Sequence, residues 1–246
     1  MTRKYEAYLA CKEVRNSISV YSRNLYKTGL PVSDYPETPE GYSAFDPRLS
    51  EYLVEQYSQV GQTVLDPFFG WGTRLESCIR KHRKYVGFDV SPEAFGRVSQ
   101  WLGDRDTAIL YNDDGCALKG IHDKSIDMVL SCPPYWDLER YAKGVNQLSE
   151  ASYEDFLIQM ERCIRRLFSV LTDSGYVCFV MGSFRRDGKY VTVSEDLCNL
   201  FLLCGFIIHD RMAVRVKSKA SRSSYRNAEH GTLADCNESV FVFKKP

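Results

Sequence analysis

From Arg48 onward, hydrophobic and polar positions follow two alternating patterns along the chain. Short apolar runs that end at an acid, a proline or a glycine predict β-strands, and segments with apolar residues three or four positions apart predict helices. The predicted strands cover residues 63–68, 84–90, 107–114, 125–131, 175–182, 206–217 and 238–245. The predicted helices cover residues 48–57, 73–83, 91–103, 152–171 and 194–205. Ser91 and Pro92 are typical of a helix N-terminus, and Gly205 is typical of a helix end.

The order of these elements predicts an α/β, doubly wound fold. Strands that alternate with helices form right-handed crossovers, and the resulting sheet is mostly parallel and covered by helices on both faces. The last two strands break this alternation, because only a polar loop at 218–237 separates them. They are therefore predicted to form an antiparallel pair at one edge of the sheet.

The same pattern divides the chain into an extension and one domain. Residues 1–30 are rich in tyrosine and locally basic, and residues 31–47 hold four prolines and a glycine, which is typical of an irregular connector. Residues 1–47 are therefore predicted to be an N-terminal extension, and residues 48–246 a single domain.

Composition narrows the class of protein. The 246 residues carry 32 acidic and 32 basic side chains, so any nucleic-acid surface must be local. Nine cysteines without a C-x-x-C pair, mostly inside apolar runs, predict reduced thiols, and four scattered histidines predict no metal site. The apolar runs are too short to span a bilayer, and no secretory signal is visible. A cytoplasmic protein without a membrane partner is therefore expected. Either a monomer or a dimer is compatible with the sequence.

The stretch "LDPFFGWGTRL" (65–75) follows the first predicted strand and leads into a helix. Gly70 and Gly72 permit a sharp turn and a close approach of a ligand to backbone amides. Asp89 ends the second strand, 17 positions after Gly72, where an acid can bind both hydroxyls of a ribose. The acids Asp113 and Asp114 end the third strand and could receive a base amino group. A dehydrogenase is disfavoured, because the third glycine of its fingerprint is missing.

The stretch "SCPPYW" (131–136) ends the fourth predicted strand. Prolines donate no hydrogen bond to a sheet, so they stop the strand and stiffen the turn that follows. A rigid turn with a projecting aromatic, Tyr135, suits the binding of something flat.

Together these two motifs resemble the S-adenosylmethionine-dependent DNA methyltransferases that act on exocyclic amino groups, over roughly residues 40–245. In that family a D-P-F-x-G-x-G-T turn binds the cofactor and a [D/N/S]-P-P-[Y/F/W] turn binds the target base. The resemblance implies a Rossmann-like class I methyltransferase with a seven-stranded sheet and S-adenosylmethionine as cofactor. The implied cofactor contacts are Asp66, Phe68, Gly70, Gly72 and Thr73 around the methionine part, Asp89 on the ribose, Asp113 or Asp114 near the adenine, and Phe45, with Asp46, closing the pocket. For the segment around Phe45, a simple connector and packing helix is an equally open interpretation.

The resemblance also assigns a role to the proline turn. The amino nitrogen of adenine or cytosine is a poor nucleophile, because its lone pair is delocalised into the ring. The family provides acceptors for the amino hydrogens, namely the residue at the first motif position, here Cys132, and the carbonyl of Pro133. Pro133 and Pro134 hold that carbonyl in place, and Tyr135 stacks on a base flipped out of the duplex.

Cys132 departs from the family pattern, because a thiol is a weak hydrogen-bond acceptor. Cys132 could suffice beside the Pro133 carbonyl, or Ser131 or Glu139 could supply the missing acceptor. A third interpretation makes Cys132 the nucleophile of a pyrimidine carbon-5 methyltransferase. An RNA methyltransferase, and a catalytically inactive nucleic-acid-binding relative, also stay open.

A basic loop at 215–237 is the predicted DNA contact. Its cations are Arg215, Lys217, Lys219, Arg222 and Arg226, with no acid before Glu229. Further cations, Arg185, Arg186 and Lys189, occur in "FRRDGKY". The C-P-P-Y form and this segment also resemble DNA modification methylases of phages and prophages, which implies a phage or mobile-element origin and a possible role in restriction–modification. No separate recognition domain is visible, so a short target sequence, or a partner that supplies specificity, is expected.

Overall fold

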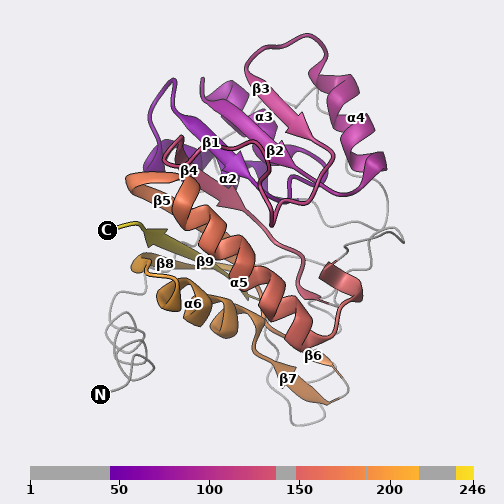
Figure 1. Ribbon diagram of the computed structural model, residues 1–246, viewed down its shortest axis with the longest axis vertical. Helices are drawn as coiled ribbons and strands as arrows, with labels where there is room; N and C mark the ends of the chain where they lie inside the picture. The colour runs from indigo at the N-terminus through magenta and orange to yellow at the C-terminus, as the bar shows by residue number, and fades with distance from the viewer. Residues whose placement is uncertain (1–44, 137–147, 187, 216–236) are drawn as a thin grey trace.

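The computed structural model describes residues 45–136, 148–186, 188–215 and 237–246 (Figure 1). Most of the predicted extension at 1–47, and all of the predicted DNA-contact loop beyond Arg215 up to residue 236, lie outside these residues. The strands are β1 Thr63–Asp66, β2 Lys84–Phe88, β3 Ala108–Tyr111, β4 Ile126–Ser131, β5 Leu171–Met181, β6 Phe184–Arg186, β7 Lys189–Val191, β8 Ile207–Arg215 and β9 Asn237–Lys244. The helices are α2 Pro47–Tyr57, α3 Thr73–Arg80, α4 Pro92–Leu102, α5 Tyr153–Val170 and α6 Val193–Leu203, with a 3₁₀ turn, η3, at Leu148–Glu150.

Seven strands form one sheet in the order β3-β2-β1-β4-β5-β9-β8. The first five strands are parallel, and β9 pairs antiparallel with both β5 and β8. The prediction of a mostly parallel sheet with an antiparallel pair at one edge is confirmed.

Helices cover both faces of this sheet (Figure 1). Alternate residues along each strand face opposite sides, so β5 sends Val177 and Phe179 to one core and Cys178 and Val180 to the other. The first core is completed by α5 and α6, and the second by α2, α3 and α4. The two buried cores make the doubly wound fold that the alternation of strands and helices predicts.

Local signals place several helix ends where the sequence predicts them. The Ser91 side chain accepts a hydrogen bond from the Ala94 amide and caps α4, which begins at Pro92. Asp46 caps α2 in the same way through the Arg48 amide at 2.9 Å. Gly205, with a φ of 99°, follows α6 in the left-handed conformation that favours glycine.

The hairpin of β6 and β7 was not predicted from the sequence. These strands form a separate two-stranded antiparallel sheet that extends from the carboxyl end of β5 (Figure 1). Each strand has only 3 residues, too few for a period-two pattern to stand out. The residues that carry Arg185, Arg186 and Lys189 are therefore an ordered arm and not a simple turn.

The carboxyl ends of β1 and β4 lie side by side at the point where the strand order reverses. In open α/β sheets, ligands bind in the crevice outside the carboxyl ends of the strands at such a switch point. The D-P-F-x-G-x-G-T turn follows β1 and the C-P-P-Y turn follows β4, so both motifs open onto this position. Because β9 is antiparallel, its first residues also lie at this edge.

Two further findings concern only the part of the chain that the structure describes. Among these residues, no helix is both long and apolar enough to cross a bilayer. Likewise, no group of three histidine, cysteine or acidic side chains there is arranged to hold a metal ion.

Gly115 follows Asp113 and Asp114 and lies in close contact with the turn after β1. A Cβ atom at this position would lie 1.9 Å from the Pro67 carbonyl oxygen, which belongs to the backbone and cannot swing aside. The absence of a side chain therefore lets two turns of the carboxyl edge touch.

We predict that Gly115→Ala lowers the free energy of unfolding by about 1–3 kcal/mol, because the backbone must shift to accept the methyl group. Gly96→Ala is the matched control. A Cβ at Gly96, on α4, would meet nothing within 4 Å, so this change should raise stability by about 0.5–1 kcal/mol. Denaturant unfolding of both variants measures the difference, and equal stabilities would contradict the packing described here.

Candidate active site

The carboxylate of Asp66, at the end of β1, is fully buried and accepts four hydrogen bonds. Oδ1 accepts from the Phe68 amide at 3.1 Å and from the Ser131 hydroxyl at 2.6 Å. Oδ2 accepts from Arg74 Nε at 2.5 Å and from the Tyr85 hydroxyl at 2.9 Å. A carboxylate has about four acceptor positions, so these donors use all of them. Asp66 therefore acts through the groups that it holds, and the direct cofactor contact expected from the motif is disfavoured.

Arg74 on α3 is the charge partner of Asp66, and it too is buried. Its Nη2 donates to the Phe68 carbonyl at 2.6 Å, and its guanidinium lies over the Phe45 ring at 5.0 Å from the ring centre. Burial raises the pKa of the Tyr85 phenol, and the nearby Asp66 carboxylate adds to this rise, so that Tyr85 stays a proton donor. Phe45 is thus part of the packing around the buried ion pair.

The glycine turn is fixed by Asp89, which follows β2. Asp89 Oδ2 accepts from the Gly70 amide and Oδ1 from the Ser91 amide, both at 2.8 Å. Burial raises the pKa of the Asp89 carboxyl, and these two amide hydrogen bonds oppose the rise. Each oxygen keeps a second acceptor position, so the carboxylate can still receive ligand hydroxyls.

The glycines themselves adopt the conformation that the turn requires. Gly70 has a φ of 54° and Gly72 a φ of 83°, and both values lie in the left-handed region. Gly72 precedes α3 without a side-chain cap, so the amides of the first turn, beginning at Thr73, face the switch point uncapped by a side chain. Phe68 is half-buried beside this turn.

The two acids after β3 differ in their surroundings. Asp114 Oδ1 accepts from the Cys116 amide at 2.8 Å, and Oδ2 lies 3.8 Å from Arg162. Asp113 Oδ1 accepts from the Asp114 amide at 2.8 Å, and its side chain is 43% exposed, against 26% for Asp114. Asp113 is the acid that is more open to a ligand.

The C-P-P-Y turn brings three side chains together. The Cys132 sulfur lies 3.3 Å from the Tyr135 hydroxyl, and that hydroxyl donates to Glu238 Oε1 at 3.2 Å. Burial raises the pKa of the Tyr135 phenol, and the neighbouring Cys132 and Glu238 raise it further. Tyr135 is therefore a neutral phenol that joins the thiol to a carboxylate on β9.

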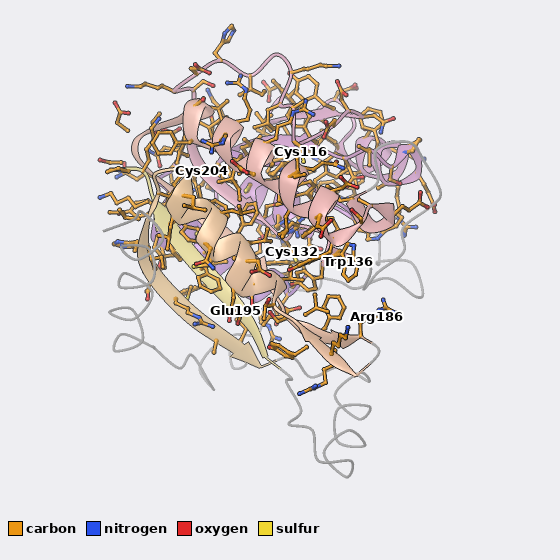
Figure 2. All side chains as sticks on the ribbon, turned by 60° about the horizontal axis from the view of Figure 1, so that its bottom comes forward. Cys116, Cys132, Trp136, Arg186, Glu195 and Cys204 are labelled. Atoms are coloured by element: carbon orange, nitrogen blue, oxygen red, sulfur yellow. The ribbon has the colours of Figure 1, made fainter. Side chains whose placement is uncertain are left out.

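Trp136 links the end of this turn to neighbouring elements. Its backbone has a φ of 48°, which is unusual for a residue with a side chain. The indole donates to the Ala151 carbonyl at 2.9 Å, and its ring lies 5.0 Å from Tyr153 and 6.5 Å from Phe184 between ring centres. These contacts join the turn to α5 and to the β6–β7 hairpin. Figure 2 labels Trp136 beside Cys132, with Arg186 on the side toward the hairpin.

Ser131 and Glu139 are the residues that could replace Cys132 as the hydrogen-bond acceptor for the target amino group. Ser131 is fully buried and its hydroxyl donates to Asp66, so it does not fill that role. Glu139 lies outside the described residues. Among the described residues, Glu238 contacts the motif, and it was not predicted from the sequence. Its position at the start of a strand antiparallel to β5 was the only signal that could have indicated it.

The predicted DNA-contact cations fall into two groups. Lys217, Lys219, Arg222 and Arg226 lie outside the described residues, and Arg215 is the last residue of β8, so the structure shows no side chain of this group. Arg185 and Lys189 are exposed on the β6–β7 hairpin, with the Arg185 guanidinium 5.7 Å from the centre of the exposed Tyr190 ring. The hairpin thus presents basic and aromatic side chains beside the C-P-P-Y turn.

Comparison with solved structures identifies the fold. A SAM-dependent methyltransferase from Methanosarcina mazei matches with a TM-score of 0.56 and 16% identity, covering 78% of this chain and 96% of that one. The N-methyltransferase NodS from Bradyrhizobium japonicum, in complex with S-adenosylhomocysteine, matches with a TM-score of 0.54 and 16% identity, covering 80% and 83% of the two chains. The fold is that of the class I S-adenosylmethionine-dependent methyltransferases, as the family resemblance implies.

Sequence comparison relates part of the chain to a family of enzymes. Residues 13–98 match the family described as DNA methylase, the N6/N4 methyltransferases. The type II methyltransferase M.Cfr9I of Citrobacter freundii is 28% identical over 106 residues, 43% of this chain and 34% of the relative. M.XycI of Xanthomonas campestris pv. cyanopsidis is 36% identical over 62 residues, 25% of this chain and 21% of the relative. M.MjaII of Methanocaldococcus jannaschii is 40% identical over 48 residues, 20% of this chain and 9% of the relative.

Part of the chain, residues 13–98, is thus similar to the N6/N4 DNA amino-methyltransferase family, and type II methyltransferases are distant relatives. The chain spans only a minor part of the length of these curated relatives, 34% at most among the three named. The family match begins at residue 13, inside the segment that the sequence analysis separates as an extension.

We predict that Arg74→Met lowers the free energy of unfolding by about 3–5 kcal/mol, because it leaves the buried Asp66 carboxylate without its counter-ion. The control is Arg165→Met on the solvent side of α5, where the exposed arginine pairs with Glu161 one turn away. This change should leave the unfolding midpoint unaltered. Denaturant unfolding with intrinsic fluorescence measures both, and a similar effect of the two variants would contradict the role given to the buried pair.

Proposed function

We propose that this protein transfers a methyl group from S-adenosylmethionine to the exocyclic amino group of adenine or cytosine in DNA. The observation that supports this most strongly is the hydrogen bond from Ser131 to Asp66. It joins the strand that carries the glycine turn to the strand that carries the C-P-P-Y turn, so a cofactor and a target base would meet at the switch point.

The residues at the glycine turn fit the cofactor that the family uses. Asp89 offers a carboxylate with acceptor capacity left for two ribose hydroxyls, and Asp113 offers a half-exposed carboxylate for an adenine amino group. The uncapped amides at the start of α3, near Thr73, favour the carboxylate of the methionine part. When bound, S-adenosylmethionine supplies an electrophilic methyl group.

At the second site the chain contributes positioning and no covalent chemistry. The Pro133 carbonyl, which the two prolines hold rigid, and the Cys132 sulfur are the proposed acceptors for the amino hydrogens of the target base. Tyr135 is the proposed stacking platform. Its ring packs close to Gly182, where an added Cβ would lie 3.4 Å from the ring edge, and this contact fixes the ring plane.

The proposed DNA surface includes the β6–β7 hairpin, because exposed Arg185 and Lys189 can contact phosphates beside the flipped base. The basic loop from Arg215 to residue 237 is proposed to add contacts from the neighbouring strand end. Duplex DNA is the substrate favoured by the family, and origin in a phage or mobile element stays a prediction from the motifs.

Ring addition by Cys132, as in carbon-5 methylation, is the less favoured chemistry. Reactive thiolates lie in electropositive surroundings, whereas the Cys132 thiol contacts a neutral phenol and, beyond it, a carboxylate. The buried cation nearby, Arg74, is committed to Asp66. The surroundings of the thiol therefore favour an acceptor role over a nucleophilic one.

Asp89→Ala is expected to weaken S-adenosylmethionine binding about tenfold to hundredfold, because it removes charge-assisted hydrogen bonds to the ribose and loosens the glycine turn. Asp104→Ala, which removes an exposed carboxylate beyond α4, is the control and should bind normally. Isothermal titration measures both affinities, and thermal unfolding checks that the Asp89 variant is folded. Unchanged affinity in the Asp89 variant would remove this residue from the cofactor site.

The function itself is tested with labelled S-adenosylmethionine, mixed duplex DNA and mass analysis of the digested nucleosides. A methyl group on the amino nitrogen of adenine or cytosine is expected. A methyl group on a pyrimidine carbon would make Cys132 a nucleophile, and label in transfer RNA but not in DNA would change the substrate class. Binding of the cofactor without transfer to any nucleic acid would contradict the proposed activity.

A further inference from the structure

Glu238 connects two parts of the chain that are distant in sequence. It lies at the start of β9, 103 positions after Tyr135, and its carboxylate accepts the hydrogen bond of the Tyr135 hydroxyl. The antiparallel direction of β9 places its first residues at the carboxyl edge, beside the end of β5 and the C-P-P-Y turn. Glu238 is therefore held at the site by the topology of the sheet.

Among the contacts of Cys132, Tyr135 and Glu238 with one another, donor and acceptor strengths favour one direction of hydrogen bonding. Tyr135 has a single hydroxyl proton, and a carboxylate is a stronger acceptor than a thiol. That proton is therefore donated to Glu238, and the phenol oxygen becomes the acceptor for the Cys132 thiol. The raised pKa of Tyr135 keeps the hydroxyl proton in place, which preserves this direction.

This direction changes what Cys132 can offer to a substrate. When the thiol proton is donated to Tyr135, the sulfur lone pairs are directed away from the phenol oxygen, and Cys132 is half-buried. Hydrogen bonds in a chain polarise one another, and a thiol that donates toward a carboxylate becomes a better acceptor itself. The weakness of a thiol at this motif position is thereby partly offset.

We propose that Glu238 is a positioning residue of the methyl-transfer site, which acts through the Tyr135 hydroxyl to orient the Cys132 thiol as a hydrogen-bond acceptor for the target amino group. The inference rests on the proposed function. It involves hydrogen bonds only, and no bond of Cys132, Tyr135 or Glu238 is made or broken. The inference also assigns separate roles to the two parts of Tyr135. The ring stacks on the base, and the hydroxyl links Cys132 to Glu238 through hydrogen bonds.

The experiment uses the full chain with Tyr135→Phe, Glu238→Gln and the double variant. Tyr135→Phe keeps the ring and removes the hydroxyl that links Cys132 to Glu238. Glu238→Gln keeps the shape of the side chain and removes its charge. Each change should lower the single-turnover rate of methyl transfer about tenfold. The double variant should be no slower than either single variant, because both changes break the same series of hydrogen bonds. The dissociation constants of DNA and of S-adenosylmethionine should stay within about twofold of the wild type, because a positioning residue changes the rate and not the binding.

Two comparisons make the result specific. Glu161→Gln removes an exposed carboxylate on α5 and should leave the rate unchanged. In a Cys132→Asn background, which provides a strong acceptor of the family type, Glu238→Gln should have little effect on the rate. Thermal unfolding of every variant identifies any loss of rate that comes from misfolding.

The opposing outcomes are distinct. A wild-type rate in Tyr135→Phe or Glu238→Gln would overturn the inference, and so would independent, multiplying effects of the two changes. A loss of DNA binding with an unchanged rate would make Glu238 a binding residue and would overturn it as well. If the wild-type chain transfers no methyl group to any nucleic acid, the proposed function itself is wrong, and the inference is rejected with it.

Discussion

The buried carboxylate of Asp66 is the interaction on which the rest of the site depends. A charge without access to water is tolerated only when it is paired and fully hydrogen-bonded, and removal of one partner leaves the others destabilised. The donors come from β2, β4, α3 and the turn after β1, so one side chain holds four segments at fixed positions. The glycine turn and the C-P-P-Y turn are therefore set relative to each other before any ligand binds.

This arrangement suits a reaction that depends on geometry. The groups at the switch point are backbone amides, a rigid carbonyl, a neutral phenol and a half-buried thiol, and each is supported by a neighbour that limits its movement. Asp89 holds the glycine turn, Trp136 holds the end of the C-P-P-Y turn, and Glu238 holds the Tyr135 hydroxyl. Preorganised dipoles of this kind lower a barrier without the cost of reorientation during the reaction.

The fold and both motifs could be predicted because their signals are local. Period-two and helical patterns predict the strands and helices of the main domain. Gly70 and Gly72 lie within one turn, and Pro133 and Pro134 are adjacent in another. The contributions of Glu238 and Arg74 could not be predicted in this way, because they arise from tertiary contacts. Asp66 shows the same limit: its place in the motif suggests a ligand contact, whereas three of its four hydrogen-bond donors come from other segments.

The position of β9 between β5 and β8 has a consequence for how the sheet assembles. β8 cannot join the parallel strands directly, because the strand that lies between them is made from residues 237–244, later in the chain. Pairing between strands that lie far apart in sequence costs loop entropy before any contact stabilises it, and such non-local pairing generally slows folding. Since Glu238 arrives with β9, an incompletely folded chain would lack the carboxylate that supports Tyr135. Insertion of β9 between β5 and β8 therefore completes both the sheet and the site.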